Sequence, residues 1–274
     1  MGIIENDYLN CKTLINLVGK FAFGGALSLL LLAGVPWQAP VVAYGAAGLG
    51  AAIAVYVFLD ARSRASPAAD ATRKTVGSGW GIRDRTRFSA LCAIEVLDSS
   101  VRMSFLTFVA FLLIAKGLSA GWAAAAVPLV LAGGMAGKLI CGVLAEKLGV
   151  PRMIVATEIA TAAGILAAVA LPAFGVVLLL PFIGIVLQGT SSVLYATIGE
   201  YVDPERLSRG FGLFYTVGSV CGIVAPLAFG LLGDRLGVQA VMGGLGTAIL
   251  LTLPLVPLLR PQARERISAS TGLR

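Results

Sequence analysis

Hydrophobic residues along the chain form long, nearly continuous runs separated by short polar stretches. A membrane-spanning helix needs about 20 apolar residues, and eight runs meet that length. They lie at residues 13–34, 38–59, 89–115, 121–144, 152–172, 174–198, 208–232 and 237–259. They lack the polar stripe that a surface helix of a soluble protein carries. The pattern therefore predicts an all-α polytopic membrane protein with eight transmembrane helices.

Composition supports the same class. Of the 274 residues, 58% are hydrophobic and 13% are charged, whereas soluble domains contain about 25% charged residues. The 34 glycines are spread through the apolar runs, as is typical of closely packed membrane helices. No histidine is present, so a proton carrier within the spans must be Asp or Glu.

Lysines and arginines gather in alternate connections. The N-terminus, 60–88, 145–152, 199–209 and the tail after residue 259 hold most of them, and the other connections hold only Lys116 and Arg235. Cytoplasmic loops carry the excess of Lys and Arg. We therefore expect both termini and the 60–88 linker in the cytoplasm, with Trp37 and Trp122 at external ends. The net charge of +7 reflects this topology, not a nucleic-acid partner.

A short charged turn separates the fourth and fifth runs. It resembles the signature loop of the major facilitator superfamily of membrane transporters, whose pattern is roughly G-x-L-A-D-R-x-G-x-R. The matching residues are Gly142, Leu144, Ala145, Glu146, Lys147, Gly149 and Arg152. Gly142 is expected to admit a neighbouring helix, and Gly149 to give the turn its backbone freedom.

The resemblance implies two six-span halves joined by a cytoplasmic loop, and this chain looks like spans five to twelve. It assigns residues 1–59 to the last two helices of an N-terminal bundle and 89–259 to a complete C-terminal bundle. Residues 60–88 would be a basic linker and 260–274 a basic cytoplasmic tail. The first four spans are absent, so we expect a truncated transporter. The third run, from Leu97 to Phe108, is similar to the fosmidomycin-resistance-type efflux branch.

Small residues recur every four positions in the seventh run, at Gly218, Gly222, Pro226 and Gly230. Residues at this spacing share one helix face. We expect that face to permit close helix packing with a local kink. It looks like the eleventh span of the family.

Charged residues inside the third run are the first candidates for transport. Glu95, Asp98 and Arg102 share a helical face, and Asp98 lies about 16 Å along the helix from Arg87, near the membrane midplane. Intramembrane charges rarely face lipid. We expect Asp98 to titrate in a central cavity, Arg102 to bind an anionic substrate group or tune Asp98, and Glu95 to serve as a gate or second proton site. The alternative is an Asp98–Arg102 pair that only locks the helix.

Lys138 and Glu158 lie about ten residues on either side of the turn. They should therefore sit at similar depth on antiparallel helices. We expect a structural ion pair that fixes the hairpin; a proton relay is the alternative.

The sixth run offers uncharged polar side chains. Gln188 and Tyr195 are predicted substrate contacts, since a binding helix needs hydrogen-bonding groups. Its hydroxyl residues could instead bond their own helix backbone. Asp203 before Pro204 is expected to cap the next helix, or else to pair with the Arg83–Arg87 cluster as an inner gate.

No nucleotide-binding loop, Ser-His-Asp set or metal-type cysteine spacing is present. We therefore expect neither an enzyme nor a cofactor or metal. The predicted partners are a small-molecule substrate, protons and the lipid bilayer. The expected function is secondary transport, as proton-coupled efflux across a bacterial inner membrane. The alternatives are a non-transporting membrane scaffold or pseudogene fragment, and an oligomer whose partner completes the missing wall.

Overall fold

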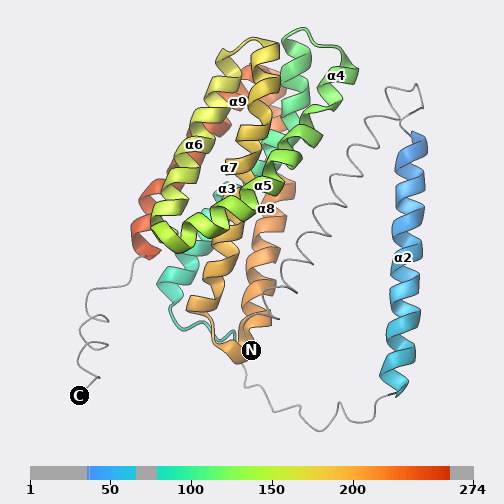
Figure 1. Cartoon of the computed structure of the whole chain (residues 1–274), viewed down its shortest axis with the longest axis vertical. Helices are drawn as coiled ribbons and strands as arrows, with labels where there is room; N and C mark the ends of the chain where they lie inside the picture. Colours follow the sequence, from blue (N-terminus) through green and yellow to red (C-terminus); the bar gives the residue numbers. More distant parts are fainter. Residues whose placement is uncertain (1–35, 37, 66–78, 260–274) are drawn as a thin grey trace. The chain divides into compact units, whose positions relative to one another are not determined.

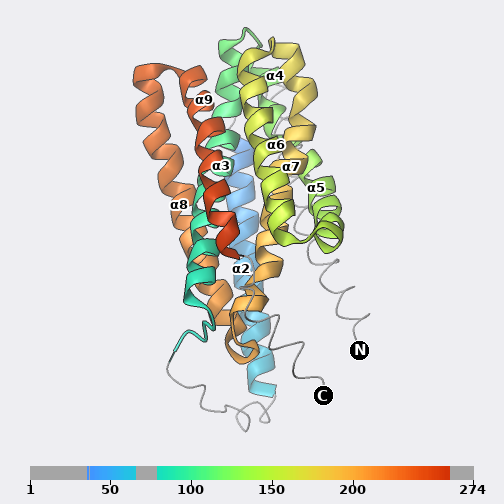
Figure 2. The same cartoon turned by 90° about the vertical axis from the view of Figure 1, so that its left-hand side faces the viewer.

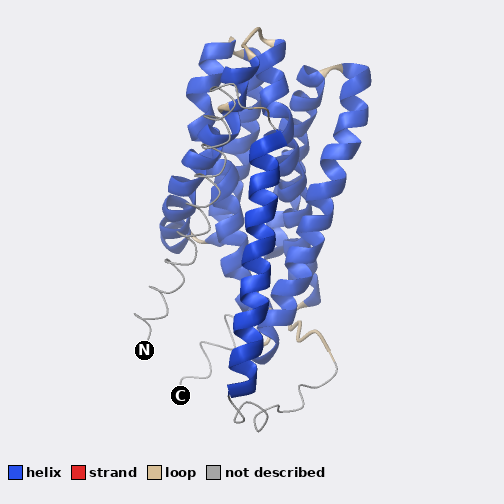
Figure 3. Cartoon of the chain, turned by 90° about the vertical axis from the view of Figure 1, so that its right-hand side faces the viewer, coloured by secondary structure: helices blue, strands red, loops and turns tan. Residues whose placement is uncertain are grey.

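The computed structural model describes Pro36, residues 38–65 and residues 79–259. These residues are almost entirely helical, and no β-strand forms among them (Figure 3). The chain divides into two compact units, Met1–Gly79 and Trp80–Arg274. In the first unit, α2 (Gln38–Ala65) covers the second predicted span. The first predicted span lies outside the described residues, as does Trp37.

The second unit contains six helical segments that are long and apolar enough to cross a membrane. Each corresponds to one of the last six predicted spans, so the prediction of an all-α polytopic membrane fold is confirmed. The segments are α3 (Arg85–Ala115), α4 (Ala120–Ala124) with α5 (Ala126–Leu148), α6 (Val150–Ala170), α7 (Ala173–Tyr201), η2 (Pro204–Arg206) with α8 (Leu207–Leu236), and α9 (Val238–Ala248) with η3 (Ile249–Leu259).

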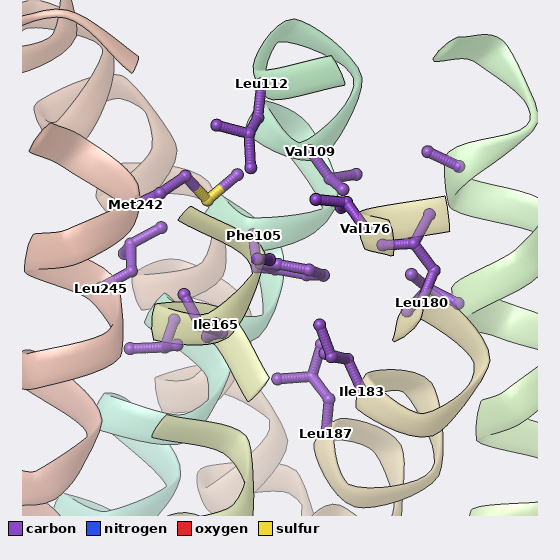
Figure 4. Packing of buried hydrophobic residues seen from close by; sticks show 14 of the residues in the cluster. Phe105, Val109, Leu112, Ile165, Val176, Leu180, Ile183, Leu187, Met242 and Leu245 are labelled. Atoms are coloured by element: carbon purple, nitrogen blue, oxygen red, sulfur yellow. The ribbon is translucent and has the colours of Figure 1, made fainter. Parts of the chain in front are cut away.

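Helix α3 lies in the middle of this bundle. It contacts α8 along one side, η3 and α9 along another, and α7 along a third (Figures 1 and 2). Helix α7 packs against both α5 and α6. The ring of Phe105 from α3 is fully buried among Ile165, Ile183 and Leu245 and further aliphatic side chains of α6, α7 and α9 (Figure 4). This core holds α3 in the interior of the bundle.

Close contact between α5 and α7 depends on glycine. A Cβ added at Gly133 or Gly137 of α5 would overlap the backbone of α7 at Pro181 or Ile185. A Cβ at Gly184 of α7 would overlap the backbone of α5 in return. In a membrane, where lipid offers no hydrophobic drive to helix association, such small residues let the backbones approach.

The connections at two ends of the bundle are shorter than predicted. Gly149, with φ of 85°, is the whole turn between α5 and α6, and Gly237, with φ of 82°, is the whole turn between α8 and α9. The sequence predicted loops at 145–152 and 233–236. The helices continue through these residues because charged side chains are tolerated in helical turns outside the membrane. The hydrophobic pattern located only the apolar part of each helix and therefore placed its end too early.

The last span is not a uniform α-helix. After α9, the chain continues from Ile249 to Leu259 with the tighter winding of a 3-10 helix, and this stretch contains Pro254 and Pro257. Proline has no N–H and cannot close an α-helical hydrogen bond. The two prolines therefore remove two α-helical hydrogen bonds from a segment that the sequence predicted as one continuous span.

Candidate functional site

Helix α3 begins at a well-formed cap. The Asp84 side chain accepts a 3.0 Å hydrogen bond from the backbone N–H of Arg87. Its other oxygen lies 3.1 Å from the guanidinium of the same arginine. An Asp at this position satisfies a free N–H at the helix N-terminus. The cap fixes where α3 starts and therefore how deep its charged residues lie.

Three charged residues of α3 meet inside the bundle, and we call Glu95, Asp98 and Arg102 the ionic cluster. The guanidinium of Arg102 donates a 2.8 Å hydrogen bond to Asp98 Oδ2 and a longer one, 3.5 Å, to Glu95 Oε1. Their exposed fractions are 2% for Glu95, 1% for Asp98 and 5% for Arg102. They face the interior of the second unit, and the Asp98–Arg102 pair offered as an alternative is formed.

Helix α8 presses directly on the ionic cluster. The Ser99 hydroxyl donates a 2.9 Å hydrogen bond to the backbone carbonyl of Gly218. A Cβ added at Gly218 would lie 2.7 Å from Glu95 Oε1, and one at Gly222 would lie 3.0 Å from Met103 Cγ. The small-residue face of α8 therefore packs on α3 beside the charged residues. The sequence offered no signal for Ser99, because a helical serine often bonds its own backbone.

Tyr195 brings α7 to the same place. Its ring stacks on Tyr215 of α8 at a centroid distance of 4.7 Å and meets Phe214 edge-on at 5.7 Å. Glu95 and Arg102 are close enough to act on its hydroxyl electrostatically. Gln188, two turns away, is half-buried and packs on Gly134 of α5.

The hydroxyl groups of α7 mostly serve their own helix. Thr190, Ser191 and Thr197 donate to the backbone carbonyls of Val186, Gln188 and Val193 respectively. These bonds satisfy the hydroxyls locally, as the sequence-based alternative supposed. Tyr195 and Gln188 instead reach toward neighbouring helices, as does Tyr201, whose hydroxyl donates a 3.1 Å hydrogen bond to the backbone carbonyl of Leu259.

Glu158 of α6 is fully buried, with no exposed surface. Neither of its carboxylate oxygens accepts a hydrogen bond from any group that the structure describes. The predicted Lys138–Glu158 pair is thus not hydrogen-bonded here; Lys138 is half-buried on α5. Glu158 instead lies within electrostatic reach of Asp98, Arg102 and Glu95. The spacing argument missed this because α3 and α6 are far apart in sequence.

Asp203 pairs with Arg83 at the end of the bundle where α7 meets η2. The distance from Arg83 Nε to Asp203 Oδ1 is 2.7 Å, and both side chains are about half exposed. Asp203 makes no capping hydrogen bond, so the expected side-chain cap is replaced by the ion pair offered as the alternative. Backbone hydrogen bonds from Arg83 to Tyr201 and from Asp203 to Gly81 reinforce the contact.

A cavity of about 580 Å³ opens beside the signature loop. Its lining includes Gly142, Glu146 and Gly149 of the loop, with Arg87 of α3 and Glu200 of α7. Gly142 has nothing within 4 Å of an added Cβ, so it borders this space and does not bring a helix close as predicted. Lys147 and Arg152 are exposed nearby. The ionic cluster does not line this cavity.

Among the described residues no group of His, Cys, Asp or Glu could hold a metal ion.

The fold and the ionic cluster together define an integral membrane protein with charged side chains held inside a helical bundle. Residues 91–274 match the sequence model of the Major Facilitator Superfamily. The match begins in α3 and continues through all the following spans. The chain therefore belongs to this superfamily and is a membrane transport protein.

Proposed function

We propose that the protein is a secondary active transporter that exports a small molecule in exchange for protons. The observation that carries the proposal is the ionic cluster. Asp98 and Arg102 are buried in a membrane-spanning helix and joined by a 2.8 Å hydrogen bond. Charges within a membrane are costly to insert and are retained where substrate or ions pass.

Asp98 is the coupling acid in this proposal, and Arg102 is the group that tunes it. A proton that reaches Asp98 neutralises the carboxylate and breaks its ion pair with Arg102. Arg102 then keeps the weaker contact to Glu95, next to the tight α3–α8 contact at Gly218. Proton binding is thereby linked to the packing of two helices.

The organisation that fits this function is a C-terminal six-helix bundle over 89–259, preceded by a cytoplasmic basic linker at 60–88 and by two helices of an N-terminal bundle within 1–59. A basic tail follows at 260–274. We place the protein in a bacterial inner membrane with both termini in the cytoplasm, on the distribution of Lys and Arg. Gln188 and Tyr195 are the proposed substrate contacts on α7.

Everted membrane vesicles provide the test. With an imposed pH gradient, fosmidomycin or a cationic dye such as ethidium should be accumulated and should collapse the gradient. Asp98→Asn should abolish both effects while the protein remains folded, and Asp234→Asn, at an exposed position near the end of α8, should change neither. Accumulation by Asp98→Asn that still follows the pH gradient would exclude Asp98 as the coupling acid.

A further inference from the structure

Glu158 is the only charged residue of α6 beyond its first turn. It belongs to the buried stripe of that helix, which also contains Ile154, Thr157, Thr161 and Ile165. Residues at these spacings point the same way. The carboxyl group therefore points into the bundle and not toward lipid.

No described side chain satisfies this carboxyl group. Both oxygens are buried without a hydrogen-bond partner in the described part of the chain. Thr157 of the same stripe donates to the backbone carbonyls of Met153 and Ile154, and the Thr161 hydroxyl is also buried without a hydrogen-bond partner among the described residues. An ionised carboxylate in an apolar interior without donors is strongly unfavourable, and the usual outcome is that the group is neutralised.

The charged groups around Glu158 come from several helices. From α3, Asp98, Arg102 and Glu95 act on Glu158, and α5 carries Lys138 at similar depth. Helix α7 contributes Tyr195 and, at its exposed end, Glu200, while α9 and η3 contain no charged residue.

The guanidinium of Arg102 is already hydrogen-bonded to Asp98 and Glu95. The region thus contains three buried carboxyl groups and one buried guanidinium. Glu158 is the carboxyl group that has no hydrogen bond to this guanidinium.

We infer that Glu158 is a second proton-binding site of the bundle, which holds its proton while Arg102 is paired with Asp98. When a proton binds Asp98, Arg102 loses that partner, keeps its 3.5 Å contact to Glu95 and becomes available as the counterion of Glu158, whose O–H bond then breaks. One proton is taken up at Asp98 and one leaves Glu158, so the charge of the buried groups stays constant. Only the use of this exchange in coupling rests on the proposed function; proton binding by Glu158 does not.

Infrared spectroscopy of the full-length protein in lipid tests the inference without transport. The C=O stretch of a protonated carboxylic acid, identified by its shift in D₂O, should be present at neutral pH and absent from Glu158→Gln. It should persist in Glu146→Gln, a matched change in the exposed signature loop. In Asp98→Asn, where Arg102 loses its 2.8 Å partner and keeps only the 3.5 Å contact to Glu95, the band should lose most of its intensity at the same pH.

Each other result overturns the inference. A band of undiminished intensity in Glu158→Gln means that the signal comes from another carboxyl group and that Glu158 is ionised. If Glu158→Gln fails to fold, Asp98→Asn alone tests the inference, and a band of unchanged intensity in that variant overturns it. A Glu158 band in a wild-type protein that moves no protons would instead overturn the proposed function and leave the proton site standing.

Discussion

The hydroxyl of Ser99 on α3 lies 2.9 Å from the backbone carbonyl oxygen of Gly218 on α8. This bond joins the two helices beside the ionic cluster, at a point where Gly218 has no side chain to separate them. The same contact places Glu95 Oε1 only 2.7 Å from where a Cβ would stand. Any change in the charge or position of Glu95 should therefore alter how α8 packs on α3.

Gly218→Ala should disturb both stability and transport. The new methyl group would push the Glu95 carboxylate away and break its 3.5 Å contact with Arg102. Overpacking of this kind costs about 1–3 kcal/mol, which should appear as a lower unfolding temperature in detergent. Gly230→Ala on the same helix is the control, since its Cβ would make an ordinary contact at 3.7 Å. Equal unfolding temperatures for the two variants would contradict this account of the contact.

Gly149→Ala should destabilise the protein for a different reason. Gly149 has φ of 85° and ψ of 145°, a conformation that costs residues with a Cβ about 1–3 kcal/mol. No atom lies within 4 Å of an added Cβ, so backbone strain is the whole effect.

Gly142→Ala separates this cause from loss of a glycine in general. Gly142 lies inside α5 and also has open space around its Cβ position. Alanine is the better helix former by about 1 kcal/mol, so this variant should be as stable as the wild type or more so. If both variants lower the unfolding temperature alike, backbone strain at Gly149 is not the cause.

Local patterns predicted the spans well and their ends less well. Runs of apolar residues locate membrane helices because lipid excludes unpaired backbone groups. They end, however, where several charged residues follow one another, and so missed the polar first turn of α3 at Arg85. The change from α-helix to 3-10 helix in the last span was also not predicted, because hydrophobicity alone does not distinguish α9 from the 3-10 segment that follows it.

The candidate site divides in the same way. Glu95, Asp98 and Arg102 were found together because positions three, four and seven apart share a helix face. Their proximity to Glu158 could not be predicted, since it depends on how α6 and α3 are placed within the bundle. The depth argument that matched Lys138 with Glu158 fixes a height in the membrane but not the direction in which a side chain points.

Removing the Arg102 guanidinium alone should destabilise the protein more than removing Arg102 and the Asp98 carboxylate together. Arg102→Met leaves Asp98 and Glu95 buried without a counterion, and breaking a buried pair in this way costs about 3–5 kcal/mol. Asp98→Asn in the same chain removes one uncompensated charge and should restore part of the loss. Thermal unfolding of both single variants and the double variant measures the coupling. Additive losses would show that the two residues do not stabilise each other.

The Arg83–Asp203 pair should contribute little to stability. Its side chains are 53% and 43% exposed, and exposed ion pairs contribute at most about 1 kcal/mol. Arg83→Gln should therefore lower the unfolding temperature slightly at low salt and not at high salt, where the charges are screened. A large loss that is independent of salt would mean that Arg83 acts through its backbone bond to Tyr201 or through another contact.

A double-mutant cycle on Glu158 and Lys138 distinguishes the two accounts of Glu158. If the residues form a structural ion pair, Glu158→Gln and Lys138→Gln should each lower membrane abundance, and the double variant should recover part of it. If Glu158 holds a proton, Gln replaces a neutral group of nearly the same shape, and Glu158→Gln should leave abundance unchanged. The effect of Lys138→Gln should then be the same in either background. Western blots of isolated membranes measure the abundance of all four proteins. Recovery of abundance in the double variant would support the structural ion pair and exclude the proton site.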